Sequence, residues 1–176
     1  MLTDEERAFL REVAWDGIRA RLMERSPGKD LPVRGRLAEP GSAFVTLRNR
    51  GDLRGCIGFI GDRLPLARCV REAAIGSIAD PRFPPVTPRE MRDLVLEISV
   101  LSAFRRVASP EEVEVGTHGL FLRRGFSSGI LLPRVATEQH YGREQFLDAV
   151  CRKSGVPEGA WKLPDTELSM FETEVF

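Results

Sequence analysis

The sequence lacks the motifs by which most metal and nucleotide sites are recognised. Its 176 residues contain no CxxC pair, no HExxH, no GxGxxG and no phosphate-binding loop of the Walker type. Histidine occurs only at His118 and His140, so a dedicated transition-metal site is not expected. The sequence therefore predicts a protein that works without a metal or cofactor of its own.

An excess of charge is also missing. The 26 basic and 26 acidic side chains balance to a net charge of zero. Because binding to nucleic acid depends on positive charge, nucleic acid is not an expected partner. No apolar run is long enough to cross a bilayer, so no membrane-spanning segment is predicted.

Cysteine is scarce, and its distribution does not suggest disulfides. Cys56, Cys69 and Cys151 are odd in number and far apart, which is typical of free thiols in a reducing compartment. The first residues, MLTDEERAFL, are acidic and helical in pattern, unlike a signal peptide. These features predict a cytoplasmic location.

The length predicts one domain over residues 1–176, with room for a smaller lobe. Thr3 followed by Glu6 forms a predicted capping box, which opens the first helix. Apolar periodicity predicts four helices and several strands along the chain. The helices are expected at about 3–24, 65–79, 133–139 and 143–154, and the strands at 43–48, 53–58, 93–101, within 113–132 and at 168–176.

The hexapeptide LRGCIG at 53–58 is the most unusual stretch. In a strand, alternate side chains face opposite ways, so Cys56 and Arg54 lie on the face away from the core. Gly55 and Gly58 flank the cysteine and leave room for a ligand or another segment to approach. The alternative is an inert cysteine that packs beneath a helix on that face.

The segment 80–85, DPRFPP, carries an acid and a base on a stiff loop. Its prolines exclude both helix and central strand. Asp80 and Arg82 either line a site or form a local contact where the preceding helix stops.

Glu97 and His118 complete the candidate groups. Glu97 lies among apolar neighbours in the 93–101 strand, and Arg54 is its expected partner. The pair is either a buried structural ion pair or an acid–base group beside a thiol. His118 lies among small residues at a strand edge and either moves protons or makes loop hydrogen bonds.

The order of these motifs resembles the AMMECR domain family, known in prokaryotes as AmmeMemoRadiSam system protein A. The motifs are LRGCIG at 53–58, DPRF at 80–83, EISVL at 97–101, HGL at 118–120, LP at 132–133, and Trp161 before an aromatic C-terminal strand. The chain departs from the family where Phe59 and Ile60 replace the usual GT. The resemblance implies an α+β fold, with a mainly antiparallel sheet, helices packed on it, and a larger and a smaller lobe.

The resemblance also implies partners, because relatives are encoded beside or fused to a Memo-type protein and a radical S-adenosylmethionine enzyme. The preferred hypothesis is an accessory protein whose LRGCIG region binds such a partner, a peptide or a small anionic ligand. Arg54 and Arg82 would then contact a carboxylate or phosphate. The alternative is an enzyme in which Cys56 is the nucleophile, assisted by Arg54 and by Glu97 or His118.

Overall fold

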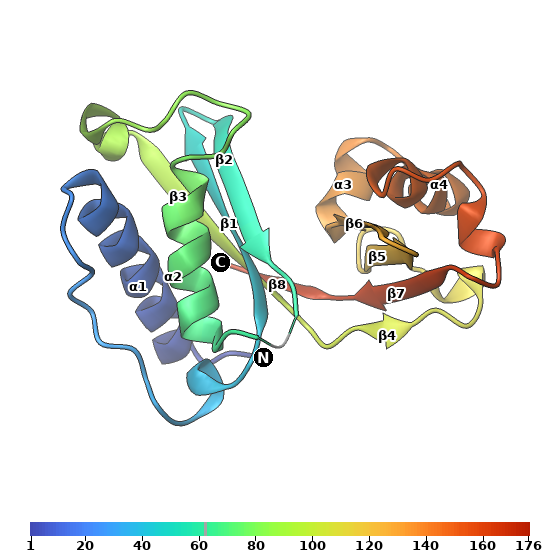
Figure 1. The fold of residues 1–176 in the computed structure, drawn as a ribbon, viewed down its shortest axis with the longest axis horizontal. Coiled ribbons are helices and arrows are strands. Elements are labelled where there is room, and N and C mark those ends of the chain that lie inside the picture. Colours follow the sequence, from blue (N-terminus) through green and yellow to red (C-terminus); the bar gives the residue numbers. More distant parts are fainter. Residues whose placement is uncertain (62) are drawn as a thin grey trace. The chain divides into compact units, whose positions relative to one another are not determined.

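The computed structural model describes residues 1–61 and 63–176, which divide into two compact units. Unit 1 comprises Met1–Val100 and Glu174–Phe176, and unit 2 comprises Leu101–Thr173. The described residues form two four-stranded antiparallel sheets with helices, which confirms the predicted α+β fold (Figure 1).

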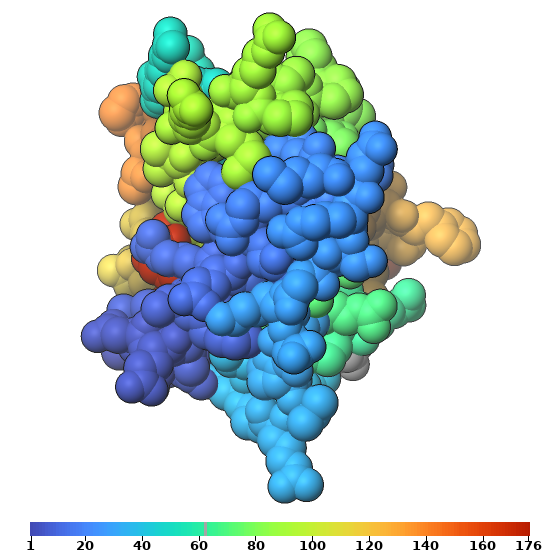
Figure 2. All heavy atoms as spheres, turned by 90° about the vertical axis from the view of Figure 1, so that its left-hand side faces the viewer, coloured from blue at the N-terminus to red at the C-terminus, as the bar shows by residue number. Residues whose placement is uncertain are grey.

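Unit 1 is a sheet with two helices on one face. The strand order is β2-β1-β3-β8. The strands are β1 (Ser42–Asn49), β2 (Asp52–Phe59), β3 (Leu94–Leu101) and β8 (Thr173–Val175), and the helices are α1 (Asp4–Leu22) and α2 (Leu66–Ser77). Two 3-10 helices, η1 (Arg36–Ala38) and η2 (Pro88–Arg92), interrupt the connecting segments. Figure 1 shows α1 and α2 side by side against the sheet, and Figure 2 shows α1 and the 23–41 segment spread across the side that faces the viewer.

The helices cover the sheet because both surfaces are apolar. Buried residues such as Ile18 of α1, Val70 of α2, Val45 of β1 and Ile98 of β3 form one core cluster. Burial of such side chains supplies the main driving force for this layer.

Helix α1 begins where the capping box predicts. The hydroxyl of Thr3 accepts the Glu6 N–H at 3.2 Å, and the Glu6 carboxylate accepts the Thr3 N–H at 2.8 Å. Two of the unpaired donors at the helix start are thereby satisfied.

Unit 2 is a second sheet with its own core. The strand order is β4-β7-β5-β6. The strands are β4 (Arg105–Arg106), β5 (Gly119–Arg124), β6 (Ser127–Leu131) and β7 (Glu167–Phe171), the helices are α3 (Pro133–Glu138) and α4 (Arg143–Lys153), and the 3-10 helices are η3 (Pro110–Glu112) and η4 (Ala160–Lys162). Buried residues that include Leu120, Phe146, Leu147 and Met170 form the core of this unit.

The prediction of a single final strand at 168–176 is wrong, because the chain forms two strands there. The chain forms β7 in one sheet and β8 in the other, with Glu172 between them. The break is held by Ser102, whose hydroxyl accepts the Glu172 N–H at 2.9 Å and whose N–H donates to the Glu172 carbonyl at 2.9 Å. The strict alternation of buried residues also fails here, since Met170 and Phe171 are both buried.

The cysteines are free thiols, as their spacing predicts. Cys69 and Cys151 are fully buried in the cores of units 1 and 2. Burial raises the pKa of both thiols, because the thiolate is poorly solvated there. No helix in the described part of the chain carries an apolar stretch long enough to cross a bilayer.

Candidate functional site

The LRGCIG segment forms β2, the outer strand of the sheet in unit 1. Cys56 lies opposite Thr46 of β1, and Gly55 lies opposite Leu47. Gly55 faces α2, because a Cβ atom there would lie 2.0 Å from the Ser77 carbonyl oxygen. Cys56 therefore faces the side of the sheet away from the helices, as the alternation predicts. Arg54 lies at a shift in the register, between Gly55 opposite Leu47 and Leu53 opposite Arg48, so alternation does not place its side chain.

Both glycines of the motif admit other parts of the chain. The carbonyl at the end of α2 occupies the space that a side chain at Gly55 would need. At Gly58 an added Cβ would lie 2.2 Å from the ring of Phe44, the residue opposite it on β1. The close approach expected at the motif is thus explained by packing at both positions, and a role for Gly55 and Gly58 in ligand binding stays a prediction.

Asp80 and Arg82 hold the outer edge of β2 at Cys56. The Cys56 N–H donates to Asp80 Oδ2 at 2.9 Å, and Arg82 Nη2 donates to the Cys56 carbonyl at 3.4 Å. Asp80 and Arg82 also pair with each other at 2.7 Å. The DPRF loop therefore takes the place of a further strand at Cys56, and the local Asp80–Arg82 contact expected after the helix is present. A role for Asp80 and Arg82 in lining a site stays a prediction.

Asp80 is ionised and almost completely buried, with 3% of its surface exposed. The pKa of this carboxyl is held well below its usual value, chiefly by the hydrogen bond from Arg82 and against the effect of burial. The backbone N–H groups of Cys56 and Arg82 lower the pKa further. In return, the hydrogen bond to Asp80 raises the pKa of Arg82.

The Cys56 thiol is half-buried, unlike the two core cysteines. Its sulfur lies 3.3 Å from the hydroxyl of Thr46, which is fully buried on the neighbouring strand. A hydroxyl can donate to a thiolate or accept from a thiol, so this contact suits either protonation state.

Arg54 pairs with Glu90, and the predicted pairing with Glu97 is wrong. Arg54 Nε donates to Glu90 Oε1 at 2.7 Å and Nη2 donates to Oε2 at 3.3 Å, which is a bidentate arrangement. Hydrogen bonds from Arg54, the first cause, and from the Thr87 backbone lower the pKa of Glu90 to about 2. The charge of Arg54 is thus neutralised within the fold.

Glu97 lies on β3, and β1 separates that strand from β2. Its flanking residues Leu96 and Ile98 belong to the core cluster, so Glu97 points away from the helices and shares its face with Cys56. The sequence predicted the correct face of the sheet for Glu97. Its predicted pairing with Arg54 is wrong, because β1 lies between the strands that carry the two residues.

His118 belongs to unit 2, where it closes a loop. Its Nδ1 accepts the Glu114 N–H at 3.0 Å, and its backbone N–H donates to the Glu114 carbonyl at 2.9 Å. This geometry corresponds to the loop hydrogen-bonding alternative. With Nδ1 as acceptor, the neutral ring carries its proton on Nε2.

Beyond the motif, β2 continues into exposed apolar residues. Phe59 is 41% exposed and Ile60 is 40% exposed. They border a pocket of about 440 Å³, which is lined by Gly41, Phe59, Ile60, Gly61, Arg63 and Leu64. No role was predicted from the sequence for Phe59 and Ile60, which replace the GT usual in the family.

Sequence reasoning also missed Glu90 and Thr46. Glu90 follows Thr87 by three residues, and its carboxylate accepts the Thr87 N–H at 2.8 Å, so the capping-box pattern was the available signal. Thr46 could have been found from the hairpin register, which sets it opposite Cys56. Across residues 1–61 and 63–176, no three His, Cys, Asp or Glu side chains gather in a way that could hold a metal ion.

Comparison with known proteins extends over both units. The sequence profile of the AMMECR1 family matches residues 11–176. A protein of Methanopyrus kandleri is 41% identical over 185 residues, which span 99% of this chain and 89% of that protein. A protein of Methanothermobacter thermautotrophicus is 42% identical over 140 residues, which span 76% of this chain and 73% of its own. The crystal structure of an uncharacterised protein of Pyrococcus horikoshii superposes with a TM-score of 0.85 at 35% identity, covering 96% of this chain and 88% of the other.

Proposed function

The chain belongs to the AMMECR1 family, and from this premise we propose that it is an accessory protein that binds its partners through the outer edge of β2. The partners implied by the sequence resemblance are a Memo-type protein and a radical S-adenosylmethionine enzyme. The binding surface comprises residues 56–60 and the pocket beside Phe59 and Ile60. We call this surface the β2 edge.

The observation that carries the proposal is the contrast along this one strand. At Cys56 the outward N–H and carbonyl are both engaged by side chains of the DPRF loop. Two residues further on, Gly58 turns its N–H and carbonyl in the same outward direction, because backbone groups alternate along a strand. An extended segment of a partner can pair with these backbone groups by adding a strand to the edge.

Exposed apolar residues would supply affinity next to this backbone contact. Phe59 and Ile60 flank a pocket that also contains Arg63. Buried anchors of this kind carry most of the binding energy in protein interfaces, and a nearby arginine suits a carboxylate on the partner.

The charges near Cys56 favour binding over catalysis. A nearby cation can activate a cysteine by lowering its pKa, but Arg54 is bidentate to Glu90 and Arg82 is paired with Asp80. Arg82 keeps 56% of its side chain exposed, so it is the cation of this group best placed to meet an anionic ligand.

Direct binding measurements with matched variants test the proposal. The full chain would be immobilised and exposed in turn to the Memo-type protein and the radical S-adenosylmethionine enzyme of the same organism. We expect Ile60→Asp to weaken binding at least about tenfold, since an acid would replace an interface anchor. Val33→Asp makes the same chemical change at a residue that is 90% exposed in the 23–41 segment, and it should bind as wild type does. Absence of binding to both proteins, or equal binding by Ile60→Asp, would refute the proposal.

One observation favours a second candidate, an enzyme that uses Cys56 as its nucleophile. Cys56 is half-buried, whereas Cys69 and Cys151 have no exposed surface. The pH dependence of alkylation in a Cys69→Ala/Cys151→Ala variant separates the two functions. An apparent pKa at or below about 7 would favour the nucleophile, and a value near the ordinary 8.5 would count against it.

A further inference from the structure

A second pocket lies within unit 2, and its lining includes none of the residues named in the predicted site. Its volume is about 280 Å³, which is near the lower limit for pockets that hold small molecules. It is lined by Arg106, Val107, Ala108, Ser109, Pro110, Trp161, Lys162, Thr166 and Leu168. The lining comes from three separated stretches of chain, so the fold itself creates the pocket.

The charge of this lining is of one sign. Arg106 and Lys162 are cationic, and no lining residue is acidic. Three acidic side chains of the neighbouring segments pair with arginines outside the lining: Glu112 with Arg105, Asp165 with Arg124, and Glu167 with Arg123. Glu111 accepts a hydrogen bond from the hydroxyl of Ser109, a lining residue, so one carboxylate lies beside the pocket. Among the described residues no ion pair includes Arg106, so its charge is available to a ligand.

One wall is an aromatic ring held in a fixed position. Trp161 donates from Nε1 to Asp148 Oδ1 at 2.9 Å, and the same oxygen accepts the Gly159 N–H at 2.9 Å. Lys162 Nζ lies 4.7 Å from the centre of the Trp161 ring, within the range of a cation–π contact. The ring and the ammonium group are therefore arranged before any ligand arrives.

The floor of the pocket is apolar and equally constrained. Val107 donates its N–H to the Leu168 carbonyl at 2.9 Å, which continues the pairing of β4 with β7. Leu168 is 6% exposed, and the buried Thr166 donates its hydroxyl to the Ala160 carbonyl at 2.7 Å. A preformed site loses little entropy on binding, which favours a true ligand pocket over a surface irregularity.

We propose that this pocket binds a small molecule that combines one anionic oxygen group, a carboxylate or a phosphate, with a compact apolar or planar body. Arg106 and Lys162 bind the anionic group by charge-assisted hydrogen bonds. The apolar body packs between the Trp161 ring and the Val107–Leu168 floor. This site is independent of the β2 edge, so either proposal can fail without the other.

Trp161 provides the readout for the test. The chain contains two tryptophans, and Trp15 on α1 in unit 1 serves as the internal reference. The full chain would be titrated with benzoate, phenyl phosphate and the neutral benzyl alcohol while both indole N–H resonances are followed by NMR. We expect at least one of the two anions to shift the Trp161 resonance saturably and leave the Trp15 resonance in place. Benzyl alcohol should bind at least about tenfold more weakly, because it lacks the charge.

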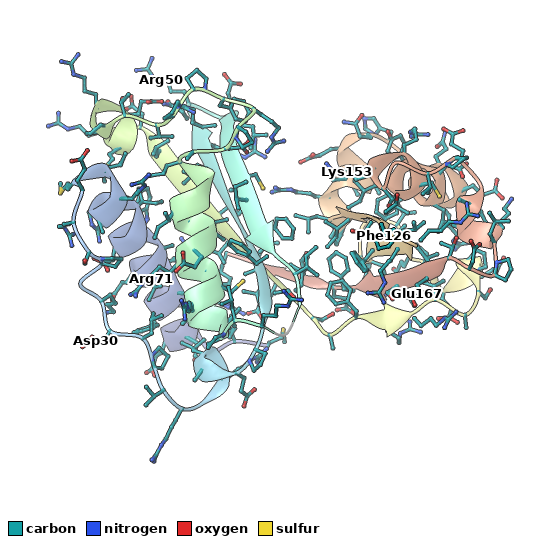
Figure 3. All side chains as sticks on the ribbon, in the orientation of Figure 1. Asp30, Arg50, Arg71, Phe126, Lys153 and Glu167 are labelled. Atoms are coloured by element: carbon teal, nitrogen blue, oxygen red, sulfur yellow. The ribbon has the colours of Figure 1, made fainter. Side chains whose placement is uncertain are left out.

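Charge variants complete the experiment. Arg106→Gln and Lys162→Gln should each weaken binding of the anion about tenfold. Lys153→Gln removes a lysine of the same unit that does not line the pocket, and its affinity should equal that of wild type (Figure 3). The proposal is overturned if no anion shifts the Trp161 resonance, if benzyl alcohol binds as tightly as the anions, or if Arg106→Gln and Lys162→Gln bind like Lys153→Gln. Comparison of benzoate with phenyl phosphate shows which anionic group the pocket prefers.

Discussion

The N–H of Cys56 donates to Asp80 Oδ2 at 2.9 Å, so a buried carboxylate occupies the position that the next strand of the sheet would take. Edge strands invite pairing with other chains, and proteins usually block them with charges or covering segments. Within residues 1–61 and 63–176, the side chains of the DPRF loop bind the backbone of β2 at Cys56. The strand is therefore protected in the middle and available toward Ile60, and partner binding is proposed at that end.

Removal of the Asp80 carboxylate should destabilise unit 1. In Asp80→Ala the Cys56 N–H and the Arg82 guanidinium lose their acceptor, and we expect a loss of about 2–3 kcal/mol in the free energy of unfolding. Asp80→Asn keeps an acceptor oxygen but not the charge, so its loss should be smaller, about 1–2 kcal/mol. Urea unfolding followed by circular dichroism measures both, with the exposed Asp30→Asn as control (Figure 3). An Asp80→Ala variant as stable as wild type would show that this carboxylate does not hold the strand.

Gly55 should not tolerate even a methyl group. A Cβ at this position would lie 2.0 Å from the Ser77 carbonyl oxygen, a backbone atom that cannot rotate away. We expect Gly55→Ala to lower the free energy of unfolding by about 3 kcal/mol or more, through displacement of the end of α2. At Gly28 the nearest atoms are 3.9 Å away or more, so Gly28→Ala should change stability by less than about 0.5 kcal/mol. The same urea experiment compares the two variants, and similar stabilities would contradict the packing explanation.

The sequence predicted local features of the fold well, because they depend on neighbouring residues. The capping box at Thr3 and Glu6, the hairpin around residues 49–52 and the face of Cys56 all follow from short-range rules. The single strand predicted at 168–176 failed, because its division between two sheets depends on Ser102, a residue about seventy positions away.

The partners within the candidate site were predicted less well. Which side chain meets Arg54 depends on the order of strands and on the path of the loop after α2, and a sequence pattern specifies neither. Glu90 reaches Arg54 from a 3-10 helix, whereas Glu97 lies on a strand beyond β1. His118 was grouped with Cys56 from chemistry alone, and it belongs to a loop of the other unit.

The Arg54–Glu90 pair should make stability depend on pH in the acidic range. The pKa of Glu90 is about 2 in the folded chain and 4.5 as an ordinary glutamate, so the unfolded state binds the proton more readily. The stabilisation is therefore fully present above about pH 5 and is lost as the pH falls toward 2. Glu90 keeps a quarter of its side chain exposed, so we expect a contribution of about 1–3 kcal/mol. Urea unfolding between pH 7 and 3 should show a shallower decline for Glu90→Gln than for wild type. If the stability of wild type and of Glu90→Gln declined equally with pH, Arg54 would not lower the pKa of Glu90 as proposed.

A double-mutant cycle tests the corrected pairing. Arg54 and Glu90 share two hydrogen bonds, and their side chains are only 16% and 25% exposed. We expect Arg54→Met and Glu90→Gln to couple by about 1–3 kcal/mol in the free energy of unfolding. The matched cycle of Arg54→Met with Glu97→Gln should give a coupling below about 0.5 kcal/mol. A larger coupling energy for Arg54 with Glu97 than for Arg54 with Glu90 would support the pairing predicted from the sequence.

Thiol labelling should distinguish Cys56 from the other two cysteines. Cys69 and Cys151 are fully buried, and burial raises the pKa of both, so they react only when the fold opens. Since each 1.4 kcal/mol of opening free energy slows labelling about tenfold, both should react at least about a hundredfold more slowly than Cys56. Iodoacetamide labelling at pH 8, read by peptide mass spectrometry, measures the three rates in one sample, and unfolding in urea should make them equal. Faster labelling of Cys69 than of Cys56 in the folded chain would mean that the motif's sulfur is enclosed, and the proposed role of Cys56 as a nucleophile would be refuted.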